Sequence, residues 1–371
     1  MGDVTKIEWC DHTFNPWVGC TKVAPGCVNC YAEADMDKRR HFALWGPNGT
    51  RIRTSPANWK KALKWNRDAA CTCDKPLGQS SMEAFATCPQ HRPSGRPRVF
   101  CASLADVFED WAGQPQMANG QWVIKRRENG VVKELVGCNL KGGNDAATLD
   151  DVRRELFQLI DATPNLDWLL LTKRPENILR MWPRVGFPDA GVPGSLGKRL
   201  YLKNVQLGTS ISDQATADAA SHHLLKCRDL CPVLFVSAEP LLGPVDLRCV
   251  QSDGLVEIDA LTGDHGVNRP LAGRSSARLD WVIVGGESGH NARQCQIEWV
   301  RSLVTQCDET GVACFVKQLG AKPCAIIQRN FACFGPEWLS KSKDKKGAAW
   351  LEWPEDLRVR QFPRLESAVT V

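Results

Sequence analysis

Six short apolar runs recur along the chain, and each of them ends in a small group of polar residues. Their length and nearly continuous hydrophobicity are typical of strands that are buried on both faces. The runs span residues 98–108, 166–177, 204–213, 232–245, 279–289 and 313–320. A further strand is expected near the N-terminus, from Lys6 to Trp9.

Amphipathic segments lie between these runs and predict helices. Residues 150–163 place Val152, Leu156, Leu159 and Ile160 on one face, residues 213–227 start at an aspartate cap, and residues 297–311 end at a glycine. Strands that alternate with helices indicate a parallel sheet. The sequence therefore predicts an α/β fold, a single domain built as a partial or full parallel (βα) barrel.

Three segments interrupt this alternation and are interpreted as insertions between core units. Residues 71–97 are rich in Cys, Pro and Gly, and residues 249–278 have the composition of a surface insertion. Residues 113–147 contain Asn129 and Gly130, a pair typical of a β-hairpin turn.

Polar residues follow several of the predicted strands. In a parallel barrel all strand carboxyl ends open on one face, and that face carries the functional site. Capping of the following helices is the alternative role for such residues. The candidates are Ser103, Asp106, Lys173, Arg174, Glu239 and Glu287.

Composition limits the classes of protein. The chain has 371 residues, is 43% hydrophobic and carries a formal charge of +5, which is compatible with a nucleic acid or nucleotide as substrate or partner. No apolar run approaches the roughly 18 residues that span a bilayer. The first residues lack the apolar core of a signal peptide. We therefore expect a cytoplasmic protein without a membrane partner.

Seventeen cysteines are unusual for a chain expected in a reducing compartment. There a disulfide framework is disfavoured, and clustered cysteines indicate metal binding or catalysis. Scattered cysteines are expected to be small buried side chains. These are Cys138, Cys227, Cys249, Cys307 and Cys314.

Cys20, Cys27 and Cys30 form the most informative group, with the spacing C-x6-C-x2-C. Three thiolates leave one metal position open, and on a [4Fe–4S] cluster they leave one iron free to bind another molecule. The alternative is a closed structural site, in which Cys10, Asp11 or His12 supplies the fourth ligand.

This motif, which follows the first expected strand, resembles that of radical S-adenosylmethionine (SAM) enzymes, whose usual spacing is C-x3-C-x2-C. The resemblance implies that the three cysteines hold a [4Fe–4S] cluster and that the methionine moiety of SAM binds the open iron. It implies an electron from an external donor, a 5′-deoxyadenosyl radical, and hydrogen abstraction from a substrate.

A second resemblance covers most of the chain and concerns a phage-associated family with a three-cysteine motif and a poorly defined function. It implies radical-SAM-like chemistry, in the host cytoplasm for a phage protein, without indicating a substrate. The motifs that carry it are TKIEWCDHTFNPWVGCTKVAPGCVNCYAE, LLLTKRPEN, VSAEPLLGPVDL, WVIVGGESGHNAR, FVKQLG and WPEDLRVRQFP.

The radical SAM resemblance also implies roles for individual residues. Gly285, Gly286 and Glu287 match a Gly-Gly-Glu motif that binds the methionine amino group, although here the motif follows a late strand. Ser103 and Asp106 are rivals for that role. Lys173 and Arg174 are candidates for the methionine carboxylate or a substrate phosphate, and Glu239 is a candidate for a ribose hydroxyl.

A second metal site is predicted in the first insertion. Cys71, Cys73, Cys88 and His91 read C-x-C-x14-C-x2-H, and four such ligands close a zinc tetrahedron. A segment with few apolar residues needs such a metal to fold. An auxiliary iron–sulfur cluster and unligated surface cysteines are the alternatives.

The leading hypothesis is a radical SAM enzyme that modifies or repairs a nucleic acid, a nucleotide or a related polar substrate. The basic runs KKALKWNR and VIKRRENG favour such a substrate. The alternatives are a metal-stabilised nucleic-acid-binding accessory protein without radical chemistry, and a metal-dependent hydrolase that uses Asp106, Glu239 and Glu287.

Overall fold

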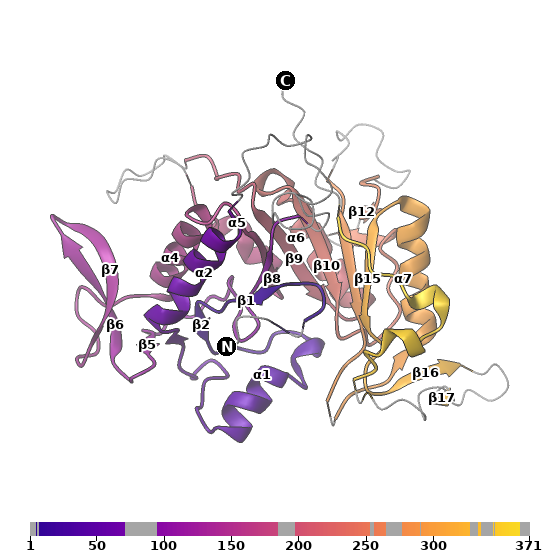
Figure 1. The fold of residues 1–371 in the computed structure, drawn as a ribbon, viewed down its shortest axis with the longest axis horizontal. Helices are drawn as coiled ribbons and strands as arrows, with labels where there is room; N and C mark the ends of the chain where they lie inside the picture. The colour runs from indigo at the N-terminus through magenta and orange to yellow at the C-terminus, as the bar shows by residue number, and fades with distance from the viewer. Residues whose placement is uncertain are drawn as a thin grey trace. The chain divides into compact units, whose positions relative to one another are not determined.

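The protein has an α/β fold, shown in Figure 1. The computed structural model describes residues 5, 7–70, 95–184, 197–252, 256–264, 277–289, 291–326, 333–334, 344 and 346–363. The predicted zinc ligands Cys71, Cys73, Cys88 and His91 lie outside the described residues.

The main sheet has seven strands, and their order in the sheet is the same as their order in the chain. The pairs β1–β4, β4–β8, β10–β13 and β13–β15 are parallel. A sheet that winds in one direction without a reversal of strand order is consistent with a partial (βα) barrel. The strands are β1 (His12–Thr13), β4 (Arg98–Cys101), β8 (Asp167–Thr172), β9 (Val205–Ile211), β10 (Val233–Ala238), β13 (Trp281–Gly285) and β15 (Ala313–Gln318).

Burial of the central strands follows from their apolar sequences. Every residue of β9, β10 and β13 is buried. Strands of this kind are covered on both faces, as the continuous hydrophobic runs predicted.

The chain forms two compact units. The first comprises Met1–Lys22, Ala32–Leu170 and Leu179–Gln206, and the second comprises Val23–Tyr31, Leu171–Ile178 and Leu207–Val371. The organisation of the chain as a single domain stays a prediction.

The first unit contains two longer helices and a second, smaller sheet. Figure 1 shows β6 and β7 as a two-stranded ribbon that extends away from the helices of this unit. The elements are α2 (Pro56–Asp68), α4 (Leu149–Asp161), β2 (Trp17–Val18), β3 (Ile52–Arg53), β5 (Gln116–Met117), β6 (Trp122–Glu128), β7 (Val131–Cys138) and the π-helix Ala34–Arg39.

In the second unit α7 packs against β13 and β15, and α6 packs against β11. Val250 and Leu261, from the third predicted insertion, are fully buried, so this segment contributes to the core. The elements are α6 (Gln214–Leu225), α7 (Ile297–Thr310), β11 (Val250–Ser252), β12 (Val256–Ile258), β14 (Cys295–Gln296), β16 (Pro323–Ile326) and β17 (Cys333–Phe334), with 3-10 turns at Pro25–Cys27, Pro175–Asn177, Arg228–Leu230, Trp350–Glu352 and Glu355–Leu357. Two short helices, α1 (Tyr31–Glu33) and α5 (Ile178–Met181), complete the chain's described helices.

The three predicted helices are confirmed, and their ends have clear local causes. Thr148 and Asp151 form a reciprocal capping box at the start of α4, and Asp213 accepts the backbone N–H of Thr216 at the start of α6 (2.9 Å). Gly311 follows α7 with a φ of 70°, a conformation that favours glycine. The hairpin turn at Asn129 and Gly130 is also confirmed, with φ values of 50° and 79°.

The position of the first strand was predicted wrongly. The backbone N–H of Cys10 bonds to the carbonyl of Ile7 (3.3 Å), so the chain turns where a strand was expected near Lys6–Trp9. The apolar residue at position 9 serves packing and not strand formation, because the Trp9 ring lies against Phe100 with 4.7 Å between the ring centroids. The first strand is β1, in which His12 pairs with Val99 of β4.

None of the helices within the described residues is long and apolar enough to cross a membrane.

Candidate functional site

Residues 25–30 form a tight turn in the second unit that carries two of the three motif cysteines; we call it the cysteine turn. Pro25–Cys27 is a 3-10 turn, and the N–H of Cys30 bonds to the carbonyl of Cys27 (3.3 Å). A bond between residues three apart closes a turn whose end residues have Cα atoms within about 7 Å of each other. Cys27 and Cys30, both free and half-buried, therefore lie close together.

The cysteine turn lies against residues that follow three strands of the main sheet. A Cβ added at Gly26 would be 2.7 Å from Ser212 Oγ, 3.2 Å from Pro240 Cδ and 3.7 Å from Lys173 Cε. These residues come just after β9, β10 and β8, so the turn contacts the carboxyl-end face where a site was predicted. A side chain at position 26 would push the Ser212 hydroxyl aside.

A polar network joins the cysteine turn to the loop after β13; we call it the Glu287 network (Asn29, Glu287 and Arg293). Glu287 accepts hydrogen bonds from Asn29 Nδ2 (3.0 Å), the Arg293 backbone N–H (2.8 Å) and Arg293 Nε (2.9 Å). Arg293 also pairs with Glu287 Oε1 at 2.6 Å and donates to the carbonyl of Pro25 (3.0 Å). Both ends of the turn are therefore fixed by one ion pair.

The ionisation of Glu287 reflects these contacts. Burial alone would raise its pKa, but hydrogen bonds from Arg293 and Asn29 outweigh burial and hold the pKa of Glu287 below its usual value. The same hydrogen bonding to Glu287 raises the pKa of Arg293. The Glu287 side chain is 6% exposed, so water contributes little to stabilising its negative charge. The Arg293 guanidinium supplies that stabilisation.

The two glycines before Glu287 fit close backbone contacts. A Cβ at Gly286 would lie 2.3 Å from the carbonyl oxygen of Leu319, whereas one at Gly285 would lie 3.4 Å from the Glu239 carboxyl carbon. Gly286 also exchanges hydrogen bonds with Gln318 of β15, through its N–H (3.0 Å) and its carbonyl (2.8 Å). The Gly-Gly-Glu sequence thus holds two neighbouring strand ends together.

Glu239 and Lys317, at the ends of β10 and β15, form an ion pair beside Gly285. Their side chains are 20% and 19% exposed. Arg174 after β8 is 6% exposed, and its backbone N–H bonds to Thr172 Oγ1 (2.9 Å). The second unit therefore brings Lys173, Glu239 and Glu287 to strand carboxyl ends, as predicted, and places Lys317 there as well.

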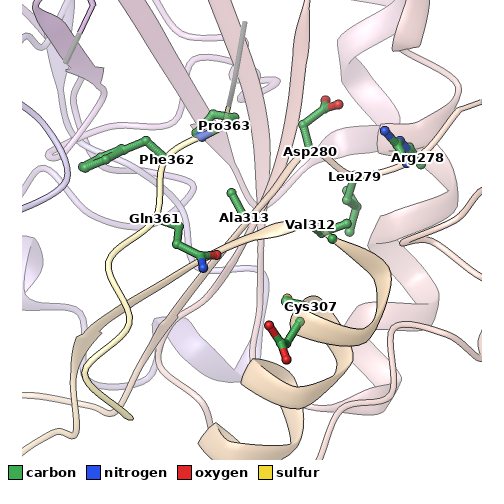
Figure 2. A pocket seen from close by; sticks show the side chains of 11 residues that line it. Arg278, Leu279, Asp280, Cys307, Val312, Ala313, Gln361, Phe362 and Pro363 are labelled. Carbon is green, nitrogen blue, oxygen red and sulfur yellow. The ribbon is translucent and has the colours of Figure 1, made fainter. Parts of the chain in front are cut away.

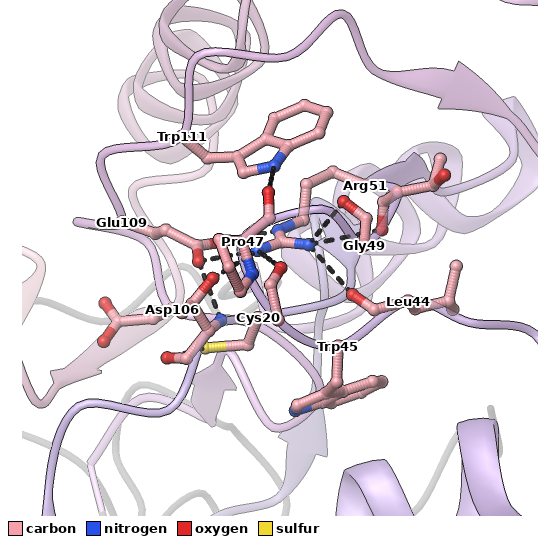
Figure 3. A network of polar contacts seen from close by, with 12 residues as sticks. Cys20, Leu44, Trp45, Pro47, Gly49, Arg51, Asp106, Glu109 and Trp111 are labelled. Carbon is pink, nitrogen blue, oxygen red and sulfur yellow. Dashed lines mark hydrogen bonds and ion pairs between the residues drawn. The ribbon is translucent and has the colours of Figure 1, made fainter.

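Cys20 belongs to the first unit and precedes a segment fixed by a buried ion pair (Figure 3). Arg51 and Glu109 are 0% and 2% exposed and pair at 2.8 Å through both Nε and a terminal nitrogen. Glu109 also accepts the N–H of Thr21 (2.8 Å), and Arg51 donates to Thr21 Oγ1 (2.8 Å). The residue after Cys20 is therefore held by both partners of the pair.

Ser103 and Asp106 lie in the same unit, in the loop after β4. Ser103 Oγ accepts a hydrogen bond from Asn15 (3.0 Å), and the buried Asp106 accepts the N–H of Phe108 (3.0 Å). The carbonyl of Leu104 accepts the N–H of Gly19 (3.0 Å), so this loop supports the residue before Cys20.

Buried cysteines differ from those of the motif. Among the predicted core cysteines Cys227, Cys307 and Cys314 are buried, while Cys138 and Cys249 are half-buried. Burial raises the pKa of Cys231 and of Cys295 to about 12, so both stay protonated. A protonated, enclosed thiol is unsuited to metal binding.

Convergence of Cys20, Cys27 and Cys30 on one cluster stays a prediction, since Cys20 belongs to the first unit and the other two to the second. Within the described residues no three His, Cys, Asp or Glu side chains are arranged to hold a metal ion. The chemistry of the motif nevertheless suits a cluster, because Cys27 and Cys30 are half-buried thiols at the two ends of one hydrogen-bonded turn.

A cavity of about 740 Å³ lies at the other end of the strands (Figure 2). Leu279 and Asp280 precede β13, Val312 precedes β15, and Cys307 comes from the last turns of α7. Since sites in parallel barrels form at the carboxyl ends of strands, this cavity is not the predicted site.

Sequence reasoning missed Asn29, Arg293, Glu109 and Arg51. Asn29 lies inside the cysteine motif, and Arg293 lies six residues after Glu287 in GGESGHNAR. Neither spacing by itself indicates a contact. The one available signal for the Glu287–Arg293 ion pair was that GGESGHNAR contains a single acidic residue and a single arginine.

The family model described as "Protein of unknown function (DUF5131)" matches residues 4–129 and 140–350. Neither the curated proteins nor the solved structures include a match to this chain.

Proposed function

The chain belongs to the DUF5131 family, and we propose that it is a radical SAM-type enzyme that binds a [4Fe–4S] cluster through Cys20, Cys27 and Cys30. Its substrate in this proposal is a nucleic acid or nucleotide. The enzyme acts in the cytoplasm, or in the host cytoplasm when a phage encodes it, and takes its electron from an external donor.

The observation that carries this proposal is the construction of the cysteine turn. Cys27 and Cys30 stand at the two ends of one hydrogen-bonded turn, which contacts residues after β8, β9 and β10 and is fixed by Glu287. Such a turn presents two thiolates with little conformational entropy to lose on metal binding. When bound, a cluster with one open iron supplies an electron for reductive cleavage of SAM.

The chain's own residues have separable roles in this proposal. Arg293 and Asn29 orient the cysteine turn through Glu287, so Glu287 acts as a positioning residue. This differs from the sequence-based expectation that Glu287 binds the methionine amino group. Glu239, which lies beside Gly285 and is less enclosed, is the carboxylate left to accept hydrogen bonds from SAM.

Lys173 and Arg174 supply positive charge after β8. The Lys173 side chain lies close to Gly26 of the cysteine turn. They suit the methionine carboxylate or a substrate phosphate. Ser103 and Asp106 belong to the loop whose Leu104 carbonyl accepts the N–H of Gly19, and in this proposal they act through that loop.

The test is anaerobic reconstitution with iron and sulfide, followed by metal analysis and visible spectroscopy of the wild type and Cys27→Ala. We expect a brown wild type that releases 5′-deoxyadenosine from SAM with a reductant, and a variant that loses iron and this activity. A colourless wild type that binds only zinc contradicts the proposal. That outcome favours an accessory nucleic-acid-binding protein without radical chemistry.

A further inference from the structure

Helix α2 exposes a basic face in the first unit; we call Lys60, Lys64 and Arg67 the α2 basic face. Spacings of four and three residues place these side chains along one side of the helix, and all three are exposed. The opposite side is anchored in the unit by buried residues. These are Asn58, Trp59, Ala62 and Trp65.

The charges of the α2 basic face are not neutralised locally. Within the described parts of the chain, none of its three residues has an ion pair, and α2 holds one acidic residue, Asp68. The other basic run of the sequence lies on the β6–β7 hairpin and is paired. Arg126 pairs with Glu134 (2.7 Å), Arg127 with Asp145 (3.1 Å) and Lys133 with Glu128 (3.8 Å).

We propose that the α2 basic face binds the phosphate backbone of a nucleic acid and that the β6–β7 hairpin does not. Seven residues of helix span about 10 Å at a rise of about 1.5 Å per residue. One strand of a duplex presents a phosphate about every 3.4 Å along its axis. A helix lying along the backbone therefore places its three cations opposite about three phosphates.

A nucleic acid fits this face better than an anionic membrane surface does. A membrane-bound amphipathic helix turns its large apolar side chains outward. In α2 the tryptophans Trp59 and Trp65 point into the unit, and Leu63 is the exposed large apolar residue, at 40%. Three charges beside a single exposed apolar side chain suit phosphates in water better than the interior of a membrane surface.

The inference rests on the nucleic-acid part of the proposed function and requires neither iron nor SAM. It is therefore tested with the full chain by fluorescence anisotropy on a labelled DNA duplex and a labelled single-stranded RNA, between about 50 and about 200 mM salt. The test variant combines Lys60→Gln, Lys64→Gln and Arg67→Gln. The matched control combines Arg126→Gln, Arg127→Gln and Lys133→Gln, which removes the same charge.

We expect log Kobs of the wild type on duplex to fall linearly with log salt. Each phosphate contact contributes about 0.9 to the slope, so the α2 variant should flatten it by about 2.7, or by about 2.1 on a single strand. The hairpin control should leave the slope within about 0.9 of the wild type. Circular dichroism confirms that both variants are folded.

Three results would overturn the inference. One is a wild type that binds neither probe. Another is a hairpin control that flattens the slope as much as the α2 variant. The third is α2-dependent binding to phosphatidylserine vesicles without binding to either nucleic acid. Each can occur while iron binding and SAM cleavage are intact, so failure here is distinguishable from failure of the enzyme proposal.

Discussion

Asn29 and Glu287 lie 258 positions apart in the chain, and their side chains form a 3.0 Å hydrogen bond. Asn29 stands between Cys27 and Cys30, whereas Glu287 follows β13. Because Arg293 binds the same carboxylate, one ion pair fixes the turn that carries both thiols.

Removing the negative charge of Glu287 should loosen the cysteine turn. In Glu287→Gln we expect retention of reconstituted iron to fall by about 10-fold or more. Loss of a group that orients a metal ligand typically lowers metal affinity by about 10- to 100-fold. We also expect faster hydrogen exchange at residues 25–30, which can be measured without metal.

Glu298→Gln is the matched control, because Glu298 pairs with Arg301 at 3.5 Å on α7 and both side chains are partly exposed. It should leave both measurements unchanged. Equal exchange at residues 25–30 in the two variants would show that Glu287 does not position the turn.

The lowered pKa of Glu287 predicts acid sensitivity. A carboxylate with a lower pKa in the folded state stabilises the fold fully above its unfolded pKa, about 4.3. This contribution is lost as pH falls through the lower folded pKa. The thermal midpoint of the wild type should therefore drop between about pH 5 and pH 3 more steeply than that of Glu287→Gln. Parallel curves for the two proteins would refute the assigned direction.

Gly286 and Gly285 form a neighbouring pair for a packing test. Gly286→Ala places a Cβ 2.3 Å from the Leu319 carbonyl oxygen, which is backbone and cannot rotate away. We expect a loss of about 1–3 kcal/mol in the free energy of unfolding, as for overpacked sites. Gly285→Ala has 3.4 Å to Glu239 and should cost clearly less. Denaturant titration distinguishes the two, and equal losses would argue against the close strand contact.

The Arg51–Glu109 pair should dominate the stability of the Cys20 segment. Glu109→Ala leaves a guanidinium that is 0% exposed without its carboxylate, and breaking such a pair costs about 3–5 kcal/mol. Glu134→Ala breaks the exposed pair with Arg126 and should cost below about 1 kcal/mol. The free energy of unfolding of both variants gives the comparison. A similarly small loss of unfolding free energy in Glu109→Ala and Glu134→Ala would mean that water solvates the Arg51 guanidinium once its carboxylate is removed.

Thiol reactivity should separate the two classes of cysteine. Cys231 and Cys295, with pKa values of about 12, hold almost no thiolate at pH 8 and are enclosed. We expect iodoacetamide to label Cys27 and Cys30 in the folded metal-free protein, and to label Cys231 and Cys295 only after unfolding. Peptide mass spectrometry reads each site, and rapid labelling of Cys231 in the folded protein would contradict its burial.

Much of the fold followed from local patterns. Continuous apolar runs predicted β8, β9, β10, β13 and β15, because strands buried on both faces need apolar residues at every position. Capping residues fixed the starts of α4 and α6, and Gly311 fixed the end of α7. The first strand was misplaced because Trp9 lies in a turn and packs against Phe100. The hydrophobic pattern does not distinguish an apolar residue that packs from a turn from one that belongs to a buried strand.

The sequence by itself determined which residues follow the strands and which cysteines are closely spaced, since both are properties of neighbouring positions. Only the tertiary structure decided that Glu287 binds Arg293 and Asn29 and that Arg51 and Glu109 hold the Cys20 segment. It also decided that the α2 basic face has no ion pair within the described residues, while the arginines of the hairpin are paired. Charges find partners through space, often across more than fifty residues, and a linear pattern carries no information about that distance.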